Sequence, residues 1–259
     1  MAETIAVLSL KGGTGKTTTV RTLADVFRRL GLDVLAIDLD PQGNLSDYFD
    51  VAPDASPTIA DVLAGKAKAK AAAHGGVIPA TPILAEVERS MSGKMGRELV
   101  LRKALKDVRK EHDLILVDCP PALGLLTING LVAADWALVS SEAQYFALQG
   151  VEGALEVVEQ AKEFYNPDLE WLGVVLNIAD MRTVHSRAAF EQLSEHYGEK
   201  VFESVIRSSI AYAESAEKGV SILDHRPDLG ADYLALADEV LDRVGLKEAR
   251  KKLKPLLAS

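Results

Sequence analysis

The strongest structural signal in the chain is the stretch TIAVLSLKGGTGKTTT at residues 4–19. Its first part, Thr4–Ser9, is a short apolar run that predicts a strand. Apolar residues at helical spacing over Lys16–Leu30 predict a helix that ends before Gly31. Between them, the glycines of Lys11–Thr19 allow a tight turn whose N–H groups converge at a helix N-terminus. This order of strand, glycine-rich loop and helix predicts a phosphate-binding loop.

The same loop contains side chains suited to a nucleoside triphosphate with magnesium. Lys16 can reach the β and γ phosphates, and the Thr17 hydroxyl can coordinate Mg²⁺. The general pattern G-x-x-x-x-G-K-[ST] requires a glycine at position 10, where this chain has Leu10 followed by Lys11. We expect nucleotide binding by the loop residues Lys11, Gly12, Gly13, Thr14, Gly15, Lys16, Thr17 and Thr18.

Carboxylates end two further apolar runs. Asp118 closes the run LILVD, and Asp38 closes DVLAID, with Asp40 two residues further on. In a parallel sheet these strand ends lie beside the phosphate loop, where a magnesium nucleotide needs acidic groups. Asp118 can hold Mg²⁺ through water, and the two-residue spacing places Asp38 and Asp40 on one face.

Several apolar runs lack polar alternation, which is typical of strands that are buried on both faces of a parallel sheet. Helical patterns separate them, for example over Gly150–Phe164, and no Pro/Gly/Ser-rich linker divides the chain. We therefore predict an α/β protein with a doubly wound, mostly parallel sheet and a single domain over residues 1–259. The Ala/Lys-rich stretch Ala64–Ala73 is expected to be a surface helix or loop. The predicted strands are 4–9, 33–38, 113–118, 134–140, 171–178 and 200–205.

Composition excludes several classes of protein. The 259 residues include one cysteine, Cys119, which rules out a disulfide framework or a cysteine-built cluster within one chain. Without a long apolar run or a signal-peptide pattern, we expect a cytoplasmic protein. The net charge of −9 argues against a generally basic nucleic-acid binder but permits a local basic patch. Residues 246–259 form a short basic tail, expected to be a helix end interrupted at Pro255 and a loose terminus.

Two of these motifs resemble those of a known group of ATPases. The run Lys11–Thr17 resembles the deviant Walker A box of the ParA/MinD superfamily of dimeric ATPases. The run Asp38–Asn44 resembles the D-x-D-P-Q-G-N box of ParA-type partition ATPases, which MinD-like members usually lack in part. Asp118–Asn129 and Tyr145–Gly150 resemble later segments of the same family, so the resemblance covers essentially the whole chain.

The resemblance implies a P-loop fold and slow, dimerisation-dependent hydrolysis of ATP with Mg²⁺. Lys11 takes the position of the lysine that reaches the partner subunit's nucleotide, and a cation supplied in trans acts like an arginine finger. Asp40 takes the position of the acid that orients the attacking water, and Asp38 lies near the magnesium site. The implied catalytic residues are Lys11, Lys16 and Asp40, and the implied metal site is Thr17, Asp38 and Asp118.

The resemblance also implies nonspecific, salt-dependent DNA binding by the ATP-bound dimer on the nucleoid. Arg182 matches a basic residue of the family, and Arg187 and Arg207 can extend the patch, together with Lys200 and Lys218.

Two features near this patch do not match the family's pattern fully. The run Ile206–Ala211 departs from the family's Ile-Pro-Arg-Asn, with Ala211 where a second basic residue is expected. Asn177 is a candidate contact to the adenine base, or a strand-end residue that satisfies the backbone.

The resemblance is compatible with three functions. The first is DNA partition, with hydrolysis stimulated by a ParB-like centromere-binding protein. The second is the positioning of a protein cargo on the nucleoid through an adaptor. The third is a MinD-like membrane-associated ATPase, which the sparse leucines and Pro255 of the basic tail make unlikely.

Overall fold

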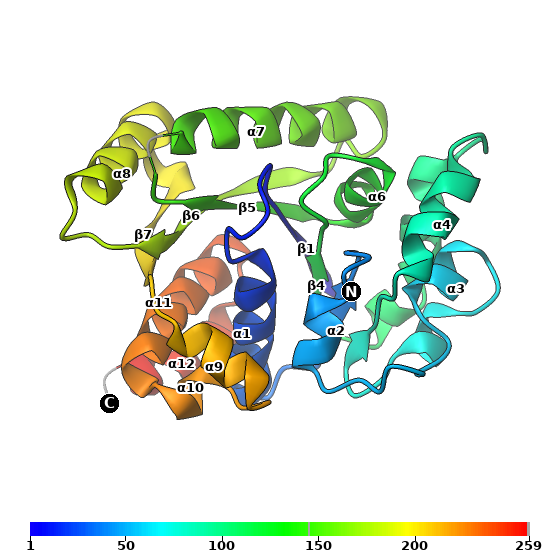
Figure 1. Cartoon of the computed structure of the whole chain (residues 1–259), viewed down its shortest axis with the longest axis horizontal. Helices are drawn as coiled ribbons and strands as arrows, with labels where there is room; N and C mark the ends of the chain where they lie inside the picture. Colours follow the sequence, from blue (N-terminus) through cyan, green and yellow to red (C-terminus); the bar gives the residue numbers. More distant parts are fainter. Residues whose placement is uncertain (145, 258–259) are drawn as a thin grey trace.

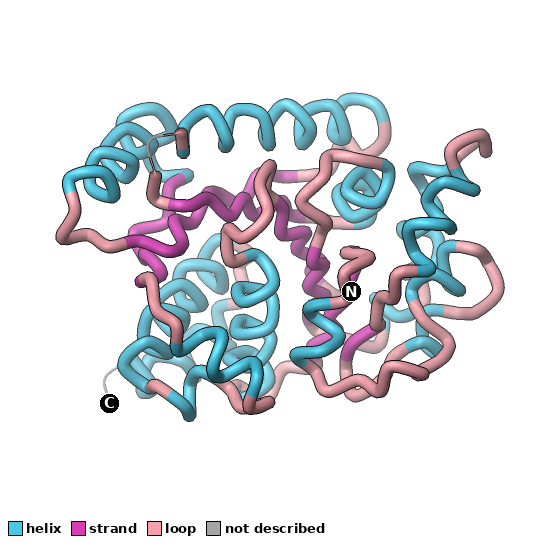
Figure 2. The backbone as a smooth tube through the Cα atoms, in the orientation of Figure 1, coloured by secondary structure: helices cyan, strands magenta, loops and turns pink. Residues whose placement is uncertain are grey.

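The computed structural model describes residues 1–144 and 146–257 and shows a sheet between two helical layers (Figures 1 and 2). The strand order is β3-β2-β4-β1-β5-β6-β7, and every neighbouring pair is parallel. The prediction of a doubly wound α/β fold is therefore confirmed. The strands are β1 (Glu3–Leu8), β2 (Val34–Asp38), β3 (Val77–Ile78), β4 (Leu114–Asp118), β5 (Trp136–Glu142), β6 (Glu170–Ala179) and β7 (Val201–Arg207).

The helices cover both faces of the sheet, because the central strands are buried on both sides. Every residue of β2 and β4 is buried, as their uninterrupted apolar sequences require. One face packs against α1, α11 and α12, and the other packs against α6 and α7 (Figure 1). The helices are α1 (Lys16–Arg29), α2 (Asn44–Tyr48), α3 (Ile59–Leu63), η1 (Ala69–Ala72), α4 (Ile83–Met91), η2 (Arg97–Leu99), α5 (Val100–Leu105), η3 (Val108–Lys110), α6 (Leu125–Ala133), α7 (Ala147–Phe164), α8 (Val184–Tyr197), η4 (Gly198–Lys200), α9 (Ala211–Glu217), α10 (Ile222–His225), α11 (Pro227–Arg243) and α12 (Lys247–Leu257).

The expected C-terminal helix is present, but it is not interrupted at Pro255. Helix α12 continues through Pro255 to Leu257, and its Ala249 and Leu253 are buried in the same apolar cluster as α1 and α11. Arg250 donates to Asp238 of α11 at 2.9 Å, which fixes the helix from its polar side. Both of these contacts lie on the N-terminal side of Pro255, and residues 254–257 around the proline are exposed. Residues 258–259 lie outside the described part, as does Tyr145 of the Tyr145–Gly150 segment.

The two edges of the sheet are built differently. Strand β3 has only two residues, which explains why no strand was predicted there. At the other edge, carboxylates of α11 cover backbone N–H groups of β7. Glu239 accepts from Glu203 N and Ser204 N at 2.9 and 2.8 Å, and Asp232 accepts from Arg207 N at 3.1 Å.

The carboxyl ends of the strands bring the predicted motifs together. The phosphate loop follows β1, Asp38 ends β2, Asp118 ends β4, and Asn177 lies near the end of β6. Asp38 and Asp118 are directly opposite in the β2–β4 register. In open parallel sheets this edge is where ligands bind. None of the helices in the described ranges is long and apolar enough to cross a membrane.

Candidate functional site

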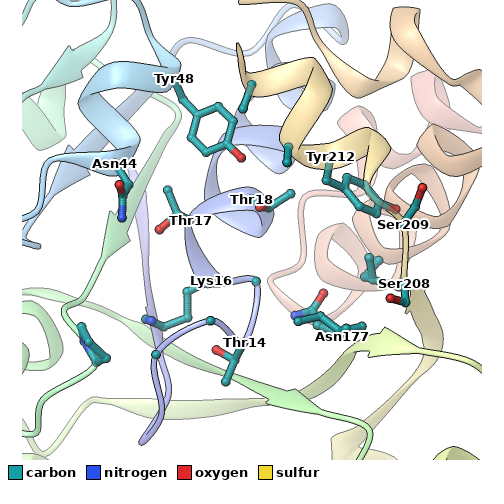
Figure 3. A pocket seen from close by; sticks show the side chains of 18 of the residues that line it. Thr14, Lys16, Thr17, Thr18, Asn44, Tyr48, Asn177, Ser208, Ser209 and Tyr212 are labelled. Carbon is teal, nitrogen blue, oxygen red and sulfur yellow. The ribbon is translucent and has the colours of Figure 1, made fainter. Parts of the chain in front are cut away.

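A cavity of about 810 Å³ opens at this edge of the sheet (Figure 3). One end is formed by the phosphate loop and the first turn of α1, and the other by the end of β7 and helix α9. Helix α2 supplies a side wall through Asn44 and Tyr48. Of the residues predicted to bind nucleotide, the cavity is lined by Gly12, Gly13, Thr14, Gly15, Lys16, Thr17, Thr18 and Asn177.

The loop is held in a shape that glycine permits. Gly13 and Gly15 have φ values of 80° and 81°, in the left-handed region that residues with a Cβ rarely adopt. Thr14 is anchored from two sides, because its hydroxyl donates to Ser9 Oγ at 3.0 Å and its carbonyl accepts from Ser140 Oγ at 2.8 Å. Strand β5 therefore fixes the loop that follows β1.

Leu10, at the usual glycine position, has a packing role. Its side chain lies over Gly153 of α7, where a Cβ would collide with Leu10 Cδ1. A small residue on the helix thus makes room for a large residue on the loop, and the loop is attached to α7 on its outer side.

Lys16 and Thr17 present polar groups at the phosphate end of the cavity. Lys16 is buried, with 6% of its surface exposed, and it makes no ion pair with any described residue. Its ammonium group has no hydrogen-bond partner among the described residues and is not among the fully buried unpaired atoms, so it is available to an anionic ligand in the cavity. The Thr17 hydroxyl donates to Asp118 Oδ2 at 2.7 Å.

Asp118 fits a divalent cation. Its Oδ1 is buried and has no hydrogen-bond partner among the described residues. Burial, and then the neighbouring Asp38 carboxylate, raise the pKa of Asp118 to about 8. A positive charge beside this oxygen would reverse that penalty. Magnesium typically takes one or two protein oxygens and fills its shell with phosphate and water, so Thr17 and Asp118 would hold it, and it would neutralise phosphate charge.

The side chain of Asp38 does not point into the cavity, although Asp38 ends a strand beside the phosphate loop. It does not line the cavity, and both of its oxygens already accept hydrogen bonds. Oδ1 accepts from Asp40 N at 3.0 Å, and Oδ2 accepts from Ser46 N and Ser46 Oγ at 3.0 and 2.8 Å. Burial raises the pKa of Asp38 to about 6. Its position ties α2 and Asp40 to the sheet, and its predicted magnesium role stays a prediction.

Asp40 lines the cavity, as expected for an acid that orients water. Its backbone N–H is held by Asp38, and its Oδ1 accepts from Gln42 N at 2.9 Å. The other carboxylate oxygen carries no protein hydrogen bond within the described residues. A carboxylate fixed in this way can align a water molecule without being a strong base.

Lys11 is the one predicted loop residue that does not line the cavity. Its Nζ lies 2.7 Å from Glu142 Oε2 at the end of β5 and 3.4 Å from Gln144 Oε1. The side chain of Lys11 is 66% exposed, whereas that of Glu142 is 17% exposed. Lys11 therefore stands at the outer rim of the loop, away from the phosphate end of its own cavity.

Asn177 is placed deeper than a simple base contact requires. It is buried, its Nδ2 donates to Ser140 Oγ at 2.7 Å, and its Oδ1 has no partner among the described residues. A Cβ on Gly15 would lie 3.2 Å from Asn177 Cγ, so the loop and β6 are in close contact here. Its side chain bonds to the hydroxyls of Ser140 and Thr19 and to no backbone group of the described residues, so the contact to the base stays a prediction.

Two aromatic residues of the cavity wall were missed in the sequence. Tyr48 of α2 and Tyr212 of α9 reach the cavity from opposite sides, near Thr18 (Figure 3). Tyr48 stacks on Arg21, with 4.7 Å from the guanidinium carbon to the ring centroid, and Tyr212 packs edge-on against Tyr233. Only tertiary structure brings these rings together, and a flat, partly apolar wall suits a nucleoside.

The predicted DNA-binding arginines lie near the ends of β6 and β7. The side chain of Arg182 is 91% exposed and donates two hydrogen bonds to the carboxylate of Asp180. These bonds lower the pKa of Asp180 to about 2. Arg187 donates to the carbonyls of Met181 and Arg182. Arg207 lines the nucleotide cavity and pairs with Asp232 at 2.9 Å.

Two expectations about the basic patch are affected. Lys200 cannot join it, because it precedes β7 while Arg207 ends that strand, so the two residues lie at opposite ends of the sheet. Lys200 donates instead to the carbonyl of Trp171. Ala211 is buried at the first residue of α9, so this position adds no charge to the patch.

Comparison with known proteins identifies the family. A family model described as an AAA domain matches residues 2–171. The chain is 39% identical over 245 residues to the chromosome-partitioning ATPase Soj of Thermus thermophilus, covering 93% of this chain and 96% of that protein. It is 35% identical over 257 residues to the chromosome partitioning protein ParA of Caulobacter vibrioides, covering 95% and 96%.

Solved structures show the same architecture with nucleotide bound. Cobyrinic acid a,c-diamide synthase from Mycobacterium smegmatis, with a bound ATP analogue and magnesium, is 35% identical with a TM-score of 0.76, covering 84% of this chain and 93% of that one. The septum site-determining protein MinD from Pyrococcus horikoshii, complexed with Mg-ADP, is 25% identical with a TM-score of 0.77, covering 95% and 99%. The family match and these identities over nearly the whole length show that the chain belongs to the ParA/MinD superfamily of P-loop ATPases, which use ATP and Mg²⁺.

Proposed function

We propose that this ATPase is a ParA-type partition protein that forms a homodimer with ATP between the subunits and hydrolyses it slowly. The observation that carries the proposal is the position of Lys11. This lysine belongs to the phosphate loop, yet it stands at the exposed rim and outside its own cavity. A cation placed there serves a partner's nucleotide better than its own, so hydrolysis depends on assembly.

Each group then has a defined task. Lys16 and the loop N–H groups bind the phosphates, and Thr17 and Asp118 hold Mg²⁺, which neutralises phosphate charge. Asp40 orients the attacking water from the cavity wall. Glu142 holds Lys11 until the second subunit meets the rim. Because these tasks are mainly alignment and charge stabilisation, slow turnover that accelerates on assembly is expected.

The test compares Lys11→Ala with Lys16→Ala. The Lys11 variant should keep ATP binding, measured by fluorescence of a labelled nucleotide, but lose at least about tenfold in hydrolysis rate. The Lys16 variant should lose binding itself. Normal hydrolysis by Lys11→Ala would remove the in-trans role and the dimer mechanism with it. An Asp40→Ala variant should bind ATP and accumulate as a dimer, seen by light scattering.

The cargo of the ATPase is proposed from its relatives, two of which are named for chromosome partition. We expect the ATP-bound dimer to bind nucleoid DNA through Arg182 and Arg187, and a ParB-like partner to stimulate hydrolysis. Asp40→Ala with ATP is a suitable bait, because it is expected to stay dimeric. Recovery of a DNA-binding adaptor supports partition, and recovery of a protein-assembly component would replace it with cargo positioning.

The membrane alternative has less support than it had from the sequence. Leu253, in the middle of the leucine stripe that a membrane helix would present, is buried against the body of the protein, whereas Leu256 and Leu257 are each 42% exposed. Flotation with anionic liposomes and ATP should leave the protein in the unbound fraction.

A further inference from the structure

Charge is distributed very unevenly along this chain. The whole sequence has 29 lysine and arginine residues against 38 aspartate and glutamate residues. Residues 64–111 reverse this balance, with eleven basic residues against five acidic ones. The Ala/Lys-rich stretch Ala64–Ala73 belongs to this segment, and none of its lysines is used by the nucleotide site. A strongly basic segment on an acidic protein is a candidate binding surface for an anionic partner.

The basic segment folds at one end of the molecule. Helices α3 and α4 lie at the far end from α8, and the loop bearing Arg182 leads into α8 (Figure 1). Helix α3 packs against both η1 and α5. Lys70 of η1 pairs with Glu111 at 2.8 Å, which brings the Ala/Lys-rich stretch beside the segment that follows α5. The two lysine-bearing segments are therefore neighbours at this end of the protein.

Four of these lysines present free charge. Lys66, Lys68, Lys103 and Lys106 are exposed, and their ammonium groups make no hydrogen bond or ion pair with any described residue. We call these four residues the lysine surface. Leu101 and Leu105 of α5 are buried, which turns Lys103 and Lys106 outward. By contrast, Asp180 and Asp232 already pair with Arg182 and Arg207.

The chemistry of the lysine surface fits a phosphate backbone. Lysine is a point charge that suits phosphate, whereas the centres of protein–protein interfaces are depleted in lysine. A membrane surface would need a continuous apolar face next to the charges. The exposed large apolar residues of this segment are Ile83 and Met95, which stand at the first residue of α4 and beyond its last.

We propose that the lysine surface binds the phosphates of duplex DNA, as a second contact that is separate from Arg182. Because the lysine surface and Arg182 lie toward opposite ends of the folded molecule, one molecule can contact DNA at two places. Two weak contacts on one polymer raise the overall affinity when both engage together. The proposal adds to the proposed function but does not depend on Lys11 or on dimerisation.

The test measures binding of a fluorescent 24-base-pair duplex of random sequence at several salt concentrations. The triple variant Lys66→Glu, Lys68→Glu, Lys106→Glu is compared with Lys247→Glu, Lys251→Glu, Lys254→Glu, which makes the same charge change on α12. The first variant should bind roughly tenfold more weakly at 0.1 M salt, and its salt slope should fall by about 2 to 3, close to one per lost phosphate contact. The α12 variant should stay within about twofold of wild type.

A conservative variant and the Arg182→Glu variant complete the design. The conservative triple variant Lys66→Arg, Lys68→Arg, Lys106→Arg should bind DNA as tightly as wild type, because it keeps the three positive charges. ATP hydrolysis without DNA should stay at the wild-type level in the lysine variants, which confirms that they fold.

Three results would overturn the proposal: unchanged binding and slope in the first variant, an equal loss in the α12 variant, or loss of anionic-vesicle binding with DNA binding intact. Failure of Arg182→Glu to weaken DNA binding would instead count against the DNA surface in the proposed function.

Discussion

In its proposed role as a magnesium ligand, Asp118 has to meet two requirements that conflict within one side chain. Binding a cation requires an ionised carboxylate, but complete burial beside Asp38 disfavours that charge while no cation is bound. The hydrogen bond from Thr17 offsets only part of this cost. The site is therefore built for its ligand at some expense to the stability of the protein without it.

The cost predicts how stability depends on pH. In the unfolded chain Asp118 would titrate near about 3.9, and in the folded chain its pKa is raised to about 8. Between these values the folded state binds a proton that the unfolded state has lost, so the free energy of unfolding falls as pH rises from about 4 to 8. Asp118→Asn should remove most of this slope and, at about 1.4 kcal/mol per pKa unit, be several kcal/mol more stable than wild type at pH 8.

Urea unfolding with a chelator at pH 5.5 and pH 8 measures the effect. Asp54→Asn, at an exposed turn, is the control and should follow wild type. The same Asp118 variant should lose magnesium-dependent hydrolysis. If its unfolding free energy keeps the wild-type pH dependence, burial of Asp118 is not the origin of the slope.

Individual residues also show where sequence reasoning stops. The phosphate loop, Asp40 and Asp118 were predicted because each sits at a strand end with a defined local pattern. The bond between Lys11 and Glu142 spans 131 residues, and the enclosure of Asp38 by Ser46 depends on where α2 packs. Contacts of this kind follow from tertiary structure, so no local pattern announces them.

At the scale of elements, α12 shows how burial can overrule a local signal. Its sequence is basic and contains Pro255, yet Leu253 is fully buried and Arg250 is bound to α11. Tertiary contacts of this type supply most helix stability in proteins. The strands were easier to predict, because a run buried on both faces is apolar throughout. The two-residue strand β3 is too short to carry such a pattern.

Truncating the anchor of α12 should destabilise the fold. Leu253→Ala removes a fully buried side chain and should lower the free energy of unfolding by about 2 to 4 kcal/mol. Leu257→Ala, at a position that is 42% exposed, should change it by less than about 0.5 kcal/mol. Denaturant titrations of the two variants measure this difference. Equal, small effects would mean that α12 is a loose tail after all.

At the scale of the whole molecule, the cavity proposed to bind the nucleotide is built from elements that are distant in sequence. The cavity walls come from the loop after β1, from α2, and from the ends of β6 and β7. A ligand bound to all of these contributes to global stability. The error over Lys200 has the opposite cause, because Lys200 is close to Arg207 along the chain but separated from it in space by the length of β7.

Mg-ATP should therefore stabilise the folded protein by mass action. At a free ligand concentration of about 100 times Kd the expected gain is about 2.7 kcal/mol, seen as a higher midpoint of thermal unfolding. Lys16→Ala is the matched control and should show little shift at the same concentration. A shift of equal size in that variant would mean that the stabilising ligand binds elsewhere.

The carboxylates of Glu239 and Asp232 along β7 have a consequence for solubility. An open sheet edge can template pairing with another chain and start aggregation. Here, three backbone N–H groups of the β7 edge are taken by side chains of α11, and the opposite edge is a strand of two residues. Neither border offers a long ladder for strand addition. If the protein dimerises and separates in each ATPase cycle, as proposed above, these edges keep its subunits from joining irreversibly through their sheets.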